Sequence, residues 1–118
     1  MTPNDLAIEL GKLYESIKAP LDRTPEGLLG ELDFRSQWLA RSAELEAEAQ
    51  FILDQKRGEV AERNSQISAT MLREILAREC ADENRLYKLA ERLNSTIVHQ
   101  IEAVRSIVSY EKESRKHG

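Results

Sequence analysis

Residues 86–108 of this chain read LYKLAERLNSTIVHQIEAVRSIV. Apolar side chains recur in this stretch at intervals of three and four residues, and an apolar position returns every eleven residues from Leu86 to Ile97 to Val108. An eleven-residue repeat is close to the natural period of an α-helix, so the stretch predicts one long helix with a buried face. The apolar residues of this face are Leu86, Ala90, Leu93, Ile97, Ile101, Val104 and Val108.

The rest of the chain also has the features of helix. Thr2 and Thr24 can each cap a helix whose first turn holds the proline that follows, and Pro20 ends the first of these helices. The apolar pattern lapses near residues 63–66, where we place the main turn. We expect helices over about residues 3–18, 25–63 and 68–113, and the sequence leaves open whether the last is broken near Asp82.

These elements predict an all-α fold with a single domain over residues 1–118. It consists of a short N-terminal helix plus a long antiparallel helical hairpin that is coiled-coil-like. The composition, with 5% aromatic and 32% charged residues, is typical of charge-laced helices and disfavours a β-sheet. A helix over residues 83–113 is about 46 Å long, whereas a compact domain of this size has a radius of gyration of about 13 to 14 Å. The molecule is therefore expected to be elongated.

An elongated hairpin leaves apolar surface that a chain of 118 residues cannot easily cover by itself. The apolar face of residues 86–108 is the candidate oligomer interface, because a second copy would supply the burial that a single chain lacks. We therefore expect a self-associating protein, either a dimer or a larger homo-oligomer.

Charge is divided unevenly along the chain. Residues 1–62 carry 7 basic and 13 acidic side chains, a net charge of −6, whereas residues 63–118 carry 10 and 8, a net charge of +2. The second half is the better candidate for binding anions, although so small a basic excess does not indicate affinity for duplex DNA. The chain contains neither a signal-peptide pattern nor an apolar run long enough to span a bilayer, so we expect a cytoplasmic protein without membrane contact.

The sharpest polar pattern is a set of cationic and hydroxyl side chains on neighbouring turns of the last helix. Its members are Arg78, Arg85, Arg92 and His99, spaced by seven residues, and then Arg105, Ser109 and Lys112. Guanidinium groups bind phosphate and carboxylate in a bidentate manner, so these residues are candidate ligand-binding residues for a small anion. For the first four residues two other interpretations stay open, since they could pair with the acidic second helix or simply coat a solvated face. For Arg105, Ser109 and Lys112 the alternative is a helix C-terminus whose cations suit the negative end of the helix dipole.

The sequence contains no motif that predicts a catalytic centre or a metal site. A hydrolase centre needs a nucleophile, a base and an orienting group, and here Cys80 and His99 are isolated from such partners. His99 and Glu102 run in the opposite order to the Glu-x-x-His motif of di-iron bundles. We expect no catalytic residues, no metal and no cofactor.

Two aromatic residues, Phe34 and Trp38, lie four residues apart near the start of the second helix. If they are exposed they could anchor a partner protein, because tryptophan is enriched at interface hot spots. Leu10, Tyr14 and Ile17 of the first helix would cover them instead if the first helix packs there. The sequence leaves this choice open.

Three segments carry a resemblance to a group of viral proteins. They are SATMLR at 68–73, DENRLY at 82–87, and LN, IVHQIEAVRS and SYEK within residues 93–112. Over about residues 35–113 the chain resembles small helical proteins of bacteriophages and prophages, in which a Ser/Ala/Thr turn joins a first helix to a long second helix. The resemblance implies a viral accessory protein of the host cytoplasm, in a group that includes counter-defence factors and neighbours of recombination genes.

We therefore expect a non-enzymatic, oligomeric helical binding protein. It would sequester a small anionic ligand, such as a nucleotide signal, or bind a host protein through its acidic second helix. The alternative is a recombination accessory protein that contacts single-stranded nucleic acid. That alternative is less favoured, because stacking needs aromatic side chains along a basic groove and the basic half holds only Tyr87 and Tyr110.

Overall fold

The computed structural model describes the backbone of residues 1–117 and the side chains of residues 1–115. Within this part the chain forms four helices and no strand: α1 (Pro3–Ile17), α2 (Pro25–Arg63), α3 (Ala69–Glu79) and α4 (Ala81–His117). The all-α class predicted from the sequence is confirmed. The molecule is also elongated as expected, with extents of 72 × 26 × 17 Å and a radius of gyration of 19.9 Å.

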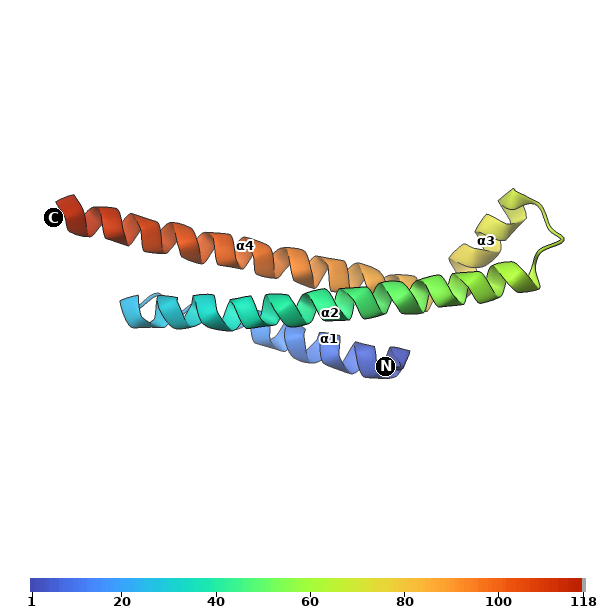
Figure 1. Ribbon diagram of the computed structural model, residues 1–118, viewed down its shortest axis with the longest axis horizontal. Coiled ribbons are helices and arrows are strands. Elements are labelled where there is room, and N and C mark those ends of the chain that lie inside the picture. The colour runs from blue at the N-terminus through green and yellow to red at the C-terminus, as the bar shows by residue number, and fades with distance from the viewer. Residues whose placement is uncertain (118) are drawn as a thin grey trace.

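The two longest helices lie side by side along the long axis and run in opposite directions (Figure 1). The shorter α1 packs against the middle of this pair and contacts both α2 and α4. At one end of the molecule α3 folds back from the end of α2, and at the other end α4 extends past the start of α2 (Figure 1). None of the helices in the described part is long and apolar enough to cross a membrane.

Local capping explains where the first two helices begin. The Thr2 hydroxyl accepts a hydrogen bond from the Asp5 amide at 3.1 Å, and the Asp5 carboxylate accepts one from the Thr2 amide at 3.1 Å, which completes a capping box. These bonds lower the pKa of Asp5. The Thr24 hydroxyl caps α2 in the same way by accepting from the Gly27 amide at 3.0 Å.

The break that the sequence left open lies at Cys80, between α3 and α4. The Cys80 backbone has φ −101° and ψ 15°, outside helical geometry, although its amide still donates to the Leu76 carbonyl at 2.9 Å. Neither proline nor glycine stands at this bend. The Cys80 side chain is 2% exposed and packs with Leu53 and Val60 of α2, so burial of the cysteine stabilises the bend.

The apolar face of residues 86–108 is covered by the chain itself. Its five central residues are at most 5% exposed, and most of them form one core with α1 and α2. Leu86 and Val108, at the two ends of this face, are partly buried. The expectation that this face is an open oligomer interface is therefore corrected, because α1 inserts four buried side chains between α2 and α4. These are Leu6, Leu10, Leu13 and Ile17.

A buried arginine on α2 joins the three packed helices. Arg35 is 1% exposed and forms an ion pair with Glu31, one turn earlier. Its Nε donates to the Gln100 side-chain oxygen on α4 at 3.0 Å, and its Nη2 donates to the Ala19 carbonyl at 3.4 Å. The Gln100 amide in turn donates to the Ile17 carbonyl, at the end of α1, at 2.9 Å. One guanidinium thus links α2, α4 and the end of α1.

The sequence did not indicate that Arg35 is buried, since arginine is seldom fully buried unless it is paired. Burial lowers the pKa of Arg35, but its ion pair and hydrogen bonds retain the charged form. The ring of Trp38 lies 5.0 Å from the guanidinium, which adds a cation–π contact.

Replacing Arg35 by methionine is expected to lower the free energy of unfolding by about 3 to 5 kcal/mol, because Glu31 and Gln100 lose a buried partner. Urea unfolding followed by circular dichroism measures this loss. The matched control is Arg41→Met, on an arginine that is 44% exposed and ion-paired, which should cost less than about 1 kcal/mol. Equal losses in the two variants would contradict a special role for the buried network.

Shortening a central residue of the covered face by Ile97→Ala is expected to cost about 2 to 5 kcal/mol, because Ile97 is fully buried within one chain. Since the contact is intramolecular, the loss should not depend on protein concentration. Thermal unfolding at several concentrations tests this. A loss that grows on dilution would mean instead that a second copy covers the residue.

Candidate functional site

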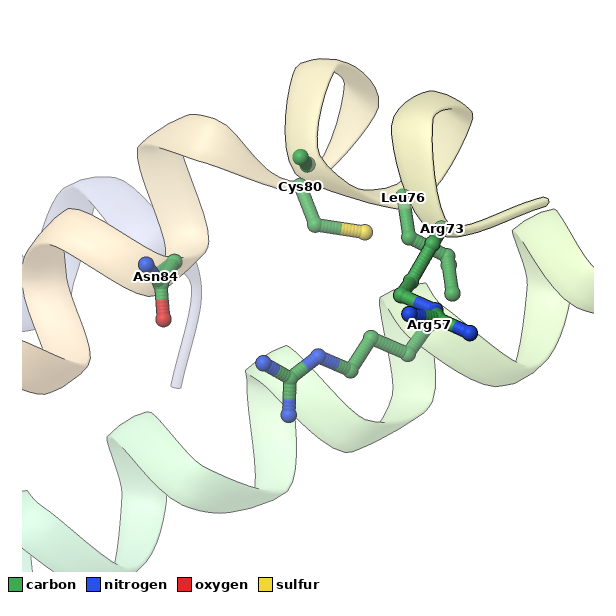
Figure 2. Close-up of a pocket in the computed structure, with 6 residues that line it drawn as sticks. Arg57, Arg73, Leu76, Cys80 and Asn84 are labelled. Carbon is green, nitrogen blue, oxygen red and sulfur yellow. The ribbon is translucent and has the colours of Figure 1, made fainter. Parts of the chain in front are cut away.

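A cleft lies at the end of the molecule where α3 folds back. It is lined by residues of α2, α3, the Cys80 bend and the first turn of α4, and its volume is about 400 Å³. The lining residues are Arg57, Arg73, Leu76, Ala77, Cys80 and Asn84. Figure 2 shows how their side chains lie around this space.

Packing of α3 against α2 creates the cleft. Ser68 caps α3 by accepting a hydrogen bond from the Met71 amide at 3.2 Å, which starts the helix immediately after the turn. Ile75 and Leu76 then pack against the small cluster of Leu53, Val60 and Cys80. No residue of α3 is fully buried, so this short helix covers the end of α2 without closing the space between them.

Two arginines from different helices give the cleft its charge. Figure 2 shows the Arg57 side chain extending along α2 on the side of the cleft toward Asn84, whereas Arg73 reaches from α3 toward α2. The Nη1 atom of Arg57 is 4.0 Å from Asp54, a loose ion pair, and among the described residues Arg73 has no ion-pair partner. None of the residues lining the cleft is acidic. The two guanidinium groups are therefore available to an anion.

Cys80 lies at the wall of this cleft and is not suited to act as a nucleophile. Burial raises the pKa of its thiol, and the nearby carboxylate of Glu83 raises it further, against the opposing effect of Arg57. The side chain is therefore protonated at neutral pH, and the protonated thiol is the unreactive form. In this cleft Cys80 contributes an apolar wall, while Asn84 adds an amide that can donate or accept a hydrogen bond.

The cationic residues selected from the sequence lie elsewhere. Arg78, Arg85, Arg92 and His99 are exposed on α3 and α4 and do not line the cleft. Arg85 is 3.7 Å from Asp82, and His99 is 3.6 Å from Glu102, so these contacts are within α4. An ion pair does join α2 to α3, between Arg63 and Glu79 at 3.7 Å.

The other three candidates lie near the C-terminal end of α4, at the opposite end of the molecule from the cleft (Figure 1). Arg105 is exposed. Ser109 and Lys112 line a shallow hollow together with Arg115, and Lys112 also borders a recess of about 130 Å³ against Leu29 of α2.

Phe34 and Trp38, near the start of α2, lie in different environments, one exposed and the other covered. Trp38 is half-buried and packs against the core that α1 completes, whereas Phe34 is 56% exposed. The two rings stack with their centroids 6.4 Å apart. The first helix therefore covers the tryptophan and leaves the phenylalanine at the surface.

Sequence reasoning missed Arg57, Arg73 and Asn84, because none of them belongs to a periodic pattern. One signal could have found the two arginines. They stand eight residues before and eight residues after Ser65, inside the main turn. In a helical hairpin, residues at similar distances from the turn lie on the same part of the hairpin, and both arginines line the cleft there.

Comparison of the chain with protein-family models, curated protein sequences and solved structures found no match.

The pH dependence of stability should report the burial of Cys80. In the unfolded chain the thiol ionises at its ordinary pKa of about 8.5, whereas in the folded chain its pKa is raised. The stability that the neutral thiol contributes is therefore complete below about pH 8.5 and is lost as the pH rises toward the raised pKa. Between about pH 8 and 10 the wild-type chain should lose more unfolding free energy than the Cys80→Ala variant does.

Urea unfolding at several pH values measures both proteins side by side. Tyr87, whose pKa is also raised by burial, is common to the two and cancels in the comparison. Parallel pH profiles for the wild type and the variant would contradict a shifted thiol.

Proposed function

We propose that this protein is a non-enzymatic binding protein that holds a small phosphate- or carboxylate-bearing anion in the cleft between α2, α3 and α4. The observation that supports the proposal is that Arg57 and Arg73, from two different helices, both line one cleft with no acidic lining residue. Each guanidinium offers a planar pair of donors that matches an anionic group.

The physical argument is that the positive charges of Arg57 and Arg73 lack a close acidic partner in the cleft. Two like charges placed around one space repel each other, and an anion between them turns that repulsion into attraction. Asn84 supplies a further donor, while Leu76 and Ala77 offer apolar contact to the rest of a ligand. A volume of about 400 Å³ lies within the range of small-molecule sites.

The resemblance to phage accessory proteins favours one form of this proposal, in which the anion is a nucleotide signal and its capture has a counter-defence role. Contact with single-stranded nucleic acid is the weaker alternative, since base stacking needs exposed aromatic side chains beside the cations. Tyr87 is half-buried, and the exposed Tyr110 lies far from the cleft.

Binding is tested by thermal shift and isothermal titration calorimetry with pyrophosphate and with nucleoside mono-, di- and triphosphates. A ligand at a hundredfold excess over its Kd stabilises the folded chain by about 2.7 kcal/mol, so a real ligand raises the unfolding temperature in proportion to the logarithm of its concentration. We expect Arg57→Ala and Arg73→Ala each to weaken binding by about tenfold or more, because a charged hydrogen bond contributes about 1.5 to 3 kcal/mol.

The matched control is Arg92→Ala, which removes an exposed cation outside the cleft and should leave the affinity unchanged. Full affinity in Arg57→Ala would exclude the cleft as the site. A chain that binds none of these anions but retards a single-stranded oligonucleotide at low salt would favour the nucleic-acid alternative.

A further inference from the structure

The outward face of α2 carries a regularly spaced stripe of acidic and neutral side chains, which we call the acidic stripe. Its positions alternate by four and three residues, the spacing of a helix–helix packing seam. Its members are Glu44, Glu48, Phe51, Gln55, Gly58 and Glu62. Five of them are exposed and Glu48 is half-buried, and Phe51 is 63% exposed at the centre. The stripe holds no cation.

The outward face of α4 carries a stripe of the opposite charge at the same kind of spacing, which we call the basic stripe. Its positions alternate by three and four residues. Its members are Arg85, Lys88, Arg92, Ser95 and His99, and all of them are exposed. At 1.5 Å per residue the basic stripe is about 21 Å long and the acidic stripe about 27 Å, so one can lie along the other over several turns.

Local ion pairs leave these charges available. Glu44 is 2.8 Å from Arg41, with side chains 67% and 44% exposed, and Arg85 is 3.7 Å from Asp82, with side chains 80% and 87% exposed. Exposed pairs of this kind contribute little to stability, so exchanging them for partners on another molecule costs little.

The two stripes of one chain cannot meet each other. Each stripe lies opposite the buried face of its own helix, and the buried faces of α2 and α4 pack together. The stripes therefore point away from each other, and a single partner copy cannot fill both. A contact between them joins different surfaces of two copies, which is a head-to-tail arrangement.

We propose that the acidic stripe of one copy packs along the basic stripe of a second copy, so that the chains associate head to tail in solution. We assign a second copy of this chain as the partner of each stripe, because the same chain carries both stripes and they match in charge, spacing and length. Phe51 supplies the apolar centre of the contact. This association does not depend on the anion cleft, which lies between α2, α3 and the first turn of α4.

Sedimentation velocity of the full chain at several concentrations tests the proposal. The average mass should rise with concentration at low salt, without stopping at a dimer. It should fall to that of one chain in about 1 M sodium chloride, where the screening length is about 3 Å. A single sedimenting chain at every concentration at low salt would overturn the proposal.

Charge reversal identifies the surfaces. The acidic-stripe variant Glu44→Lys/Glu48→Lys/Glu62→Lys and the basic-stripe variant Arg85→Glu/Lys88→Glu/Arg92→Glu should each weaken association by about tenfold or more. Lysine and glutamate are both good helix formers, and circular dichroism verifies that the helix content is retained. Phe51→Ala should weaken association without changing the charge.

Mixing the two reversed variants is the decisive step. In the mixture, the α2 stripe that now carries lysines can pack on the α4 stripe that now carries glutamates. Opposite charges meet again, so association should return to the wild-type level. The control Lys12→Glu/Lys18→Glu reverses two exposed cations, one on α1 and one at the C-terminal cap that follows it, and should leave the mass distribution unchanged. If the mixture does not associate, the stripes are not the contact surfaces. The same conclusion follows if the control variant weakens association as much as the stripe variants do.

Discussion

Arg35 can be buried only where its donors find acceptors, because an unpaired charge in the protein interior is strongly destabilising. Those acceptors come from α2 itself, from α4 and from the segment that follows α1. Apolar side chains tolerate sliding of one helix along another, whereas a hydrogen bond of 3.0 Å between Arg35 and Gln100 does not. The buried network therefore sets the register of the three-helix part, and the apolar contacts supply most of its stability.

The alignment of α2 with α4 near Arg35 also determines which residues lie close together at the other end of the molecule, where the cleft is. Since α2 and α4 are continuous helices that run in opposite directions, alignment of Arg35 with Gln100 places the part of α2 that holds Arg57 near the beginning of α4, and Arg57 and Asn84 both line the cleft. Burial of Cys80 bends the chain just before that turn and directs α3 back along α2. The cleft is thus a consequence of helix length, register and one bend, and Arg73 enters it because α3 returns along α2.

Covering of the apolar face by α1 removes the surface through which the sequence predicted self-association. A second copy is not needed to bury the face of residues 86–108. The surface that remains is charged, and it includes the acidic stripe along α2 and the basic stripe along α4. Association between such surfaces depends on salt. The anion cleft and the charged stripes lie on different surfaces, so binding and assembly can be separated by mutation.

The sequence by itself determined the helical class, the starts of α1 and α2 and the elongated shape, because periodicity and capping depend on residues a few positions apart. It predicted an anion site in the second half, whereas the cleft takes Arg73 from that half and Arg57 from the first. Only the tertiary structure decided that α1 fills the groove between α2 and α4, that Arg35 is buried and that Arg57 and Arg73 line one cleft. Each of these outcomes depends on which helix faces meet. Packing and hydrogen bonding between segments far apart in the chain, as between Arg35 and Gln100, determine which faces pack together. A local sequence pattern does not contain this information.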